Sequence, residues 1–143
     1  MPEYKILLIE DNKEDIILIE LSLKKLALKY SLKIVSDTRQ AHKILCNKKM
    51  PFKPDVILLN LNLKNGSGIK FLGNLRKDNA FKDLNVFILS DSIAATNSII
   101  KEKIEFSGYI IKPLDKIKNQ ENLELIDFFV MHHLRRFLLN IPV

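Results

Sequence analysis

The stretch from Pro54 to Leu63 limits the possible folds more than any other part of the sequence. It reads Pro-Asp-Val-Ile-Leu-Leu-Asn-Leu-Asn-Leu, and a turn that contains Gly66 and Gly68 follows it. A continuous apolar run this short, bounded by proline and glycine, is typical of a strand buried on both faces of a parallel sheet. Open α/β sheets build their sites at the carboxyl ends of such strands. The sequence therefore predicts a site at Asn60, where the apolar run first becomes polar.

Four further apolar segments alternate with amphipathic ones along the chain. We expect strands at residues 4–9, 31–35, 86–89 and 108–111 in addition to the opening run, and helices at about 12–29, 39–48, 67–77, 94–105 and 119–139. Asn12 and Ser67 have the side chains that cap helix amino ends. Five alternations of strand and helix, without an internal repeat, predict a parallel sheet with helices on both faces and right-handed crossovers.

The composition fits one soluble domain that spans residues 1–143. Hydrophobic residues make up 47% of the chain and charged residues 28%, both ordinary values for a globular protein. The single cysteine, Cys46, excludes a disulfide framework and is expected to be a small buried group. No stretch has the order of a signal peptide, and the apolar runs are too short to span a membrane. We therefore expect a cytoplasmic protein without a membrane anchor.

The net charge of +6 raises the alternative of a basic protein that associates with nucleic acid. However, the basic residues are scattered, and aromatic residues do not interleave with them as stacking platforms would. His132 and His133 have no further ligands at metal-binding spacing, so we interpret them as part of a solvated helix end. No nucleophile–base pair, phosphate-binding glycine loop or cofactor fingerprint is present, and we do not expect an enzyme.

Polar side chains follow four of the predicted strands at their carboxyl ends. These residues are Glu10, Asp11, Asn60, Asn62, Ser90 and Lys112. Because the strands are predicted to be parallel, acidic, amide, hydroxyl and amine groups should meet at one edge of the sheet. Simpler roles remain open for each: the acidic pair and Ser90 can cap helices, Lys112 can be a surface lysine, and Tyr109 can pack in the sheet.

Taken in order, these motifs resemble the receiver domain of bacterial two-component response regulators. The matching segments are Ile9-Glu10-Asp11-Asn12, Leu58-Leu59-Asn60-Leu61-Asn62-Leu63, Gly68 with Leu72, Ser90, and Gly108-Tyr109-Ile110-Ile111-Lys112-Pro113. The resemblance covers nearly the whole chain and is greatest to stand-alone receivers similar to cyanobacterial phytochrome regulators. It implies a flavodoxin-like, doubly wound, three-layered fold with five helices, a sheet order of 2-1-3-4-5, and no output domain.

The resemblance also implies a role in phosphorelay signalling for each site residue. Glu10 and Asp11 would hold Mg²⁺ together with the backbone carbonyl of Asn62 and the residue at the phosphoacceptor position, which is Asn60. Ser90 would bond the phosphoryl group, Tyr109 would be the rotating switch aromatic, and Lys112 would be the cation of the site, with a cis Lys112–Pro113 peptide. The chemistry is consistent, because phosphoryl transfer depends on positioning and on neutralising charge with a metal and an ammonium group.

The chain departs from the resemblance at the reacting atom. The family has aspartate where this sequence has Asn60, and Lys64 replaces a proline after the strand. A neutral amide oxygen is a poor nucleophile toward phosphorus, and one fewer carboxylate should weaken Mg²⁺ binding. Three interpretations follow: a pseudo-receiver that has lost phosphoacceptance, a residual switch that uses another acceptor or a deamidated Asn60, and an Asp-to-Asn substitution that freezes an ordinary receiver.

The partners implied by the resemblance are a histidine kinase or a phosphotransfer protein. A homodimer through the fourth helix, the fifth strand and the fifth helix is also expected, because family members often associate there. The first and last helices have more apolar residues than one inward stripe requires, and we expect the additional ones to face a partner. They are Ile17, Leu21, Phe128, Phe129 and Met131.

Overall fold

A five-stranded parallel sheet forms the centre of the molecule in the computed structural model, which describes residues 3–90, 93–111 and 119–141. The strands are β1 (Tyr4–Ile9), β2 (Tyr30–Val35), β3 (Val56–Asn60), β4 (Val86–Ser90) and β5 (Gly108–Ile111). Their spatial order is β2-β1-β3-β4-β5, and every neighbouring pair is parallel. The doubly wound, flavodoxin-like topology and the order 2-1-3-4-5 expected from the sequence are confirmed.

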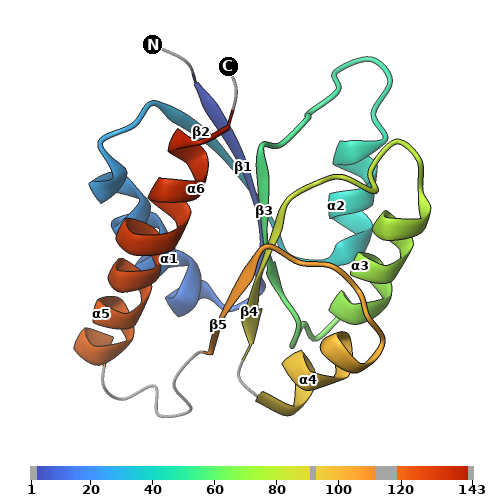
Figure 1. Ribbon diagram of the computed structural model, residues 1–143. Coiled ribbons are helices and arrows are strands. Elements are labelled where there is room, and N and C mark those ends of the chain that lie inside the picture. Colours follow the sequence, from blue (N-terminus) through green and yellow to red (C-terminus); the bar gives the residue numbers. More distant parts are fainter. Residues whose placement is uncertain (1–2, 91–92, 112–118, 142–143) are drawn as a thin grey trace.

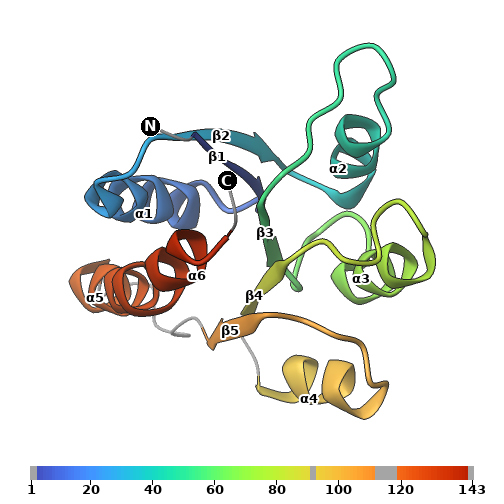
Figure 2. The same cartoon turned by 45° about the horizontal axis from the view of Figure 1, so that its top comes forward.

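Helices cover both faces of this sheet, which gives three layers (Figures 1 and 2). On one face lie α1 (Lys13–Leu23) and a long C-terminal helix that consists of α5 (Asn119–Phe129), a π-helical turn (Val130–Leu134) and α6 (Arg135–Leu139). On the other face lie α2 (Thr38–Leu45), α3 (Gly68–Lys77) and α4 (Ile93–Lys101). The five helices of the described part of the chain are those expected from the sequence.

Alternation along the strands explains the two hydrophobic cores. Successive side chains of a strand point to opposite faces of the sheet. Leu7, Ile57 and Ile88 therefore pack with α2 and α3 on one face, whereas Ile6, Leu58 and Phe87 pack with α1 and the C-terminal helix on the other. All five residues of β3 and all five of β4 are buried, so each strand is apolar up to its last residue, Asn60 or Ser90.

Several predicted boundaries and burials were wrong. The first helix ends at Leu23 and not near residue 29, because a 3₁₀ turn follows it and Ala27 then takes a left-handed conformation (φ 56°). Cys46 is exposed, since the second helix stops at Leu45 and leaves this residue at its solvent-facing end. Phe129 is buried in an edge-to-face contact with the Phe87 ring, with the ring centroids 5.3 Å apart.

The other apolar residues predicted to lie off the inward stripe are exposed. Ile17, Leu21, Phe128 and Met131 keep 57%, 44%, 58% and 37% of their accessible surface. These side chains lie on α1 and on the C-terminal helix, which pack side by side (Figure 1). An ion pair at 2.5 Å joins Lys25, in the 3₁₀ turn that follows α1, to Asp127 of α5. No helix among the described residues is long and apolar enough to cross a lipid bilayer.

Candidate functional site at the carboxyl edge of the sheet

The register of the sheet places the acidic and amide residues side by side. β1 and β3 are parallel neighbours in which Ile9 lies beside Leu59, so the next residues along, Glu10 and Asn60, are adjacent. Asn60 in turn lies beside Leu89 of β4, one residue before Ser90. This edge is the lower one in Figure 1. The sequence prediction that the strand ends bring these groups together is therefore correct for Glu10, Asn60 and Ser90.

All three of these polar residues are buried. Glu10 and Ser90 have no accessible surface, and Asn60 keeps 3%. A charge this deeply buried is tolerated only where hydrogen bonds or an opposite charge stabilise it. Glu10 meets this requirement in part through the backbone, because its Oε2 accepts from the amides of Asp11 at 3.1 Å and Asn12 at 3.3 Å.

The Asn60 side chain also forms a hydrogen bond with the Glu10 carboxylate. Asn60 Nδ2 donates to Glu10 Oε2 at 2.6 Å, and Asn60 Oδ1 accepts from the backbone amide of Asn62 at 2.9 Å. Only this orientation of the amide satisfies both neighbours, since the reverse would set oxygen against carboxylate oxygen and NH₂ against N–H. An aspartate cannot make the same pair of contacts unless it is protonated.

Asp11 and the loop after β3 are joined by a second hydrogen bond. Asp11 Oδ2 accepts from the backbone amide of Lys64 at 2.7 Å. The start of α3 is pressed against the same strand end: a Cβ on Gly68 would lie 2.9 Å from the Leu61 Cα and 3.0 Å from the Asn60 carbonyl oxygen. Glycine at this position thus permits the close approach of α3 to the site.

The bonding of Asn60 and Asp11 does not fit a divalent cation bound between Asn60 and Glu10. Mg²⁺ takes hard oxygen ligands in octahedral geometry. Asn60 directs an N–H and not an oxygen toward Glu10, and Asp11 is hydrogen-bonded to the loop. Among the described residues, no group of three or more histidine, cysteine, aspartate or glutamate side chains could hold a metal ion. A cation that bound between Asn60 and Glu10 would have to displace the hydrogen bond that joins them.

Of the two remaining predicted site residues, the structure describes Tyr109 but not Lys112. Tyr109 is 53% exposed, and its ring lies edge-on to that of Phe106, with the centroids 6.2 Å apart. Lys112, and with it the expected cis Lys112–Pro113 peptide, lies outside the described residues. The pairing of Lys112 with the acidic residues therefore stays a prediction.

Comparison with known proteins decides the family. The family model described as "Response regulator receiver domain" matches residues 6–124, which is most of the chain. The chain belongs to the response-regulator receiver family. Receivers are signalling domains of two-component systems, and the sequence prediction of this family is confirmed. None of the curated proteins compared with this receiver matches it.

Solved structures of other response regulators have the same fold. The Mn²⁺-bound form of response regulator Rcp1 is 23% identical, with a TM-score of 0.78 and coverage of 98% of this chain and 97% of that one. The phosphorylated cyanobacterial phytochrome response regulator RcpA is 26% identical, with a TM-score of 0.77 over 93% and 96%. A two-component response regulator from Legionella pneumophila is 30% identical, with a TM-score of 0.67 over 86% and 97%.

Sequence reasoning missed two contacts of the site. It anticipated either Mg²⁺ or Lys112 as the partner of the acidic residues, and not the Asn60–Glu10 and Lys64–Asp11 hydrogen bonds. The first contact has a sequence signal, because an amide at the end of one parallel strand faces an acid at the end of its neighbour. The second involves a backbone amide in a loop, for which no side-chain pattern exists.

Proposed function

We propose that this receiver signals through protein contacts and does not accept a phosphoryl group at Asn60. The hydrogen bond from Asn60 Nδ2 to Glu10 Oε2 supports this proposal more than any other observation. It joins the position expected to react to the residue expected to hold the metal. The Asn60 amide, at the phosphoacceptor position, is thus held in a hydrogen bond between a neutral donor and a charged acceptor. Such a bond contributes about 1.5–3 kcal/mol, and phosphorylation at this position would have to break it.

The proposed loss of phosphoacceptance has two chemical causes. An amide oxygen carries no negative charge and forms no stable acyl phosphate. Mg²⁺ binding is weakened as well, because Glu10 and Asp11 are the only carboxylates of the motif, and the Asn62 carbonyl and Asn60 would have to supply neutral oxygens. Ser90 and Lys112 would still occupy the positions that bond a phosphoryl group, and Tyr109 that of the switch aromatic.

The proposed partners are those of the family. A histidine kinase or a phosphotransfer protein would bind the receiver without transferring phosphate, and a second copy would associate through α4, β5 and α5. The exposed Tyr109 ring on β5 supports a contact at that edge, because exposed aromatic surface is typical of interfaces. A monomer by light scattering at several hundred micromolar would argue against the homodimer.

Phosphorylation by a small-molecule donor tests the proposal. The receiver is incubated with acetyl phosphate and Mg²⁺, and its intact mass is measured alongside that of Asn60→Asp. We expect no added phosphoryl group on the native chain and one on the variant. A stoichiometric gain by the native chain would overturn the proposal. If that gain followed a mass increase of about 1 Da, it would identify deamidation of Asn60 as the route.

A further inference from the structure

The helices α2 and α3 lie side by side on the face of the sheet opposite to α1 and the C-terminal helix (Figure 2). Residues of both helices line a groove. Its volume is about 660 Å³. Residues at helical spacing form its walls: Arg39, His42 and Lys43 on α2, and Lys70 and Asn74 on α3. Each helix therefore turns one polar face toward the groove.

The rim of this groove is cationic and not neutralised. Arg39, Lys43 and Lys70 are exposed, and none of them forms a salt bridge within the described residues. Asp78 is the one carboxylate that lines the groove, and its Oδ1 accepts from the backbone amide of Ala80 at 2.8 Å. The rim thus carries an excess of positive charge that an acidic ligand would complement.

The floor of the groove is apolar. Phe71 and Leu75 of α3 are 8% and 4% exposed, and the partly buried Phe81 also lines the groove. An apolar centre with a charged rim is the usual plan of a protein–protein interface. Phe71 is almost entirely buried in the hydrophobic core and Phe81 is only partly exposed, so the groove has no row of open aromatic rings on which nucleic-acid bases could stack.

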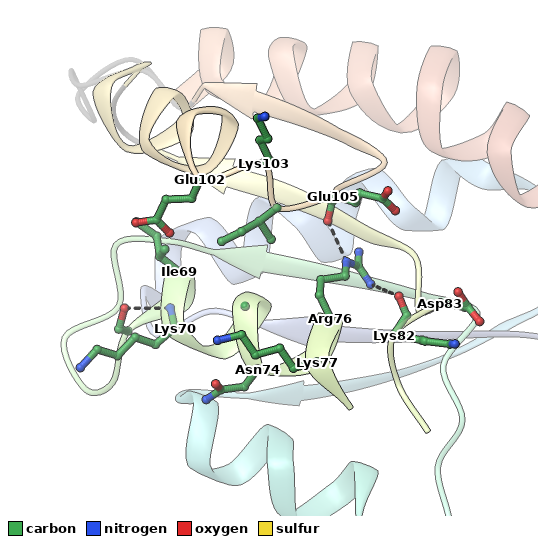
Figure 3. Close-up of a pocket in the computed structure, with 13 residues that line it drawn as sticks. Ile69, Lys70, Asn74, Arg76, Lys77, Lys82, Asp83, Glu102, Lys103 and Glu105 are labelled. Atoms are coloured by element: carbon green, nitrogen blue, oxygen red, sulfur yellow. Dashed lines mark hydrogen bonds between the residues drawn. The ribbon is translucent and has the colours of Figure 1, made fainter. Parts of the chain in front are cut away.

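The hollow on the other side of α3 lacks this charge pattern, although it is larger, at about 830 Å³ (Figure 3). Its lining includes the carboxylates Asp83, Glu102 and Glu105 among its lysines. Figure 3 shows Arg76 between Glu105 and Lys82, where it donates to both backbone carbonyls at 2.9 and 3.0 Å. Because its lining carries both positive and negative charges, this hollow favours neither an acidic nor a basic ligand.

We propose that the α2–α3 groove docks a short acidic segment of a partner protein that also carries a large apolar side chain. Aspartate or glutamate residues of the segment would meet Arg39, Lys43 and Lys70, and the apolar side chain would cover the exposed part of Phe81, beside Phe71 and Leu75. The eight residues of α2 extend about 12 Å, which limits the docked segment to roughly two helical turns. Binding should be modest and sensitive to salt, because exposed charges provide much of it.

This docking surface is independent of the proposed function. The groove residues are distinct from Glu10, Asp11, Asn60 and Ser90, and docking does not require that Asn60 be inactive. A receiver that could be phosphorylated would have the same groove. Failure of the docking proposal and failure of the pseudo-receiver proposal are therefore distinguishable.

Fluorescence anisotropy with defined probes tests the proposal. The main probe is a fluorescein-labelled eight-residue peptide of alternating glutamate and leucine. The comparison probes are an all-glutamate peptide and a twelve-nucleotide single-stranded DNA. The charge-reversal variant is Arg39→Glu with Lys43→Glu and Lys70→Glu. The matched control reverses three exposed residues on the opposite face, Lys24→Glu, Lys29→Glu and Arg136→Glu, with the same change in net charge.

We expect the groove variant to bind the glutamate–leucine peptide at least tenfold more weakly, and the control variant to change affinity by less than threefold. Raising salt from 20 to 200 mM should weaken binding of the native chain several-fold. Equal binding of the DNA or the all-glutamate peptide would overturn the proposal, since the site would then recognise charge alone. Equal loss in both variants, or sedimentation showing that the groove binds a second copy, would also overturn it. Circular dichroism confirms that both variants are folded.

Discussion

Replacing Asn60 by aspartate should destabilise the receiver unless a metal is present. The change removes the Nδ2 donor that lies 2.6 Å from Glu10 Oε2 and places a second carboxylate in a buried site. At about 3 Å and an effective dielectric constant of about 20, the repulsion between two full charges is roughly 5 kcal/mol. The site can avoid this cost by protonating the introduced carboxylate, whose O–H would then donate to Glu10 as the amide does.

Protonation of the introduced aspartate limits the loss of folding stability and makes that loss depend on pH. An aspartate with an ordinary pKa of about 3.9 takes up a proton at pH 7 at a cost of about 4 kcal/mol, and at pH 5 at about 1.5 kcal/mol. Because the folded-state pKa is raised, the destabilisation grows as pH rises and is relieved as pH falls. We expect Asn60→Asp to lose about 2–4 kcal/mol at pH 7, and no more than about 1.5 kcal/mol at pH 5.

Urea unfolding followed by circular dichroism measures this loss, with Asn65→Asp as the control. Asn65 is exposed in the loop after β3, so its variant undergoes the same change of charge without burial. Adding 10 mM Mg²⁺ should restore at least half of the stability of Asn60→Asp and leave the native chain unchanged. A variant as stable as the native chain at pH 7 without metal, or a loss that is equal at both pH values, would refute the reasoning.

Three further predictions concern the scaffold. Arg76→Ala should lower the free energy of unfolding in urea by about 2–4 kcal/mol, because the half-buried guanidinium donates to the carbonyls of Lys82, Leu84 and Glu105. The control Lys77→Ala changes an exposed residue and should cost under about 0.5 kcal/mol. Gly68→Ala should cost about 1–3 kcal/mol, since its Cβ would press on backbone, whereas Gly73→Ala, whose Cβ would lie 3.8 Å from Ile104 Cδ1, should stabilise by up to about 1 kcal/mol. Burial raises the pKa of Asp127, but its pKa is lowered overall, chiefly by the hydrogen bond and ion pair with Lys25. Asp127→Asn should therefore cost under about 1 kcal/mol at pH 7 and nothing once the pH falls below the folded pKa.

The fold was predictable because the apolar runs, the helical periodicity and the capping residues all indicate the same order of strands and helices. β1 and β5 begin and end where their apolar runs do, and α3 follows directly on its Ser67 cap, whose hydroxyl accepts from the Lys70 amide. The helix ends were less predictable where no glycine or proline marks them. Ala27 takes the left-handed conformation that glycine usually occupies, and the π-helical turn from Val130 has no sequence signature.

The sequence predicts which residues gather at the candidate site, but not which of their atoms form hydrogen bonds with one another. Parallel strands bring their carboxyl ends to one edge, so Glu10, Asn60 and Ser90 had to gather there. Which atom bonds to which depends on the register and on the rotation of one amide. The exposure of Cys46 was missed for a similar reason, because helix α2 ends one residue before it.

Anomalous diffraction from crystals of the native chain grown with Mn²⁺ tests the central claim most directly. Manganese takes the same oxygen ligands as magnesium and is visible by its anomalous scattering. We expect no anomalous peak at the carboxyl edge of the sheet and an intact hydrogen bond between Asn60 and Glu10. A peak between Asp11, the Asn62 carbonyl and Asn60, with the Asn60 amide rotated to present its oxygen, would contradict it.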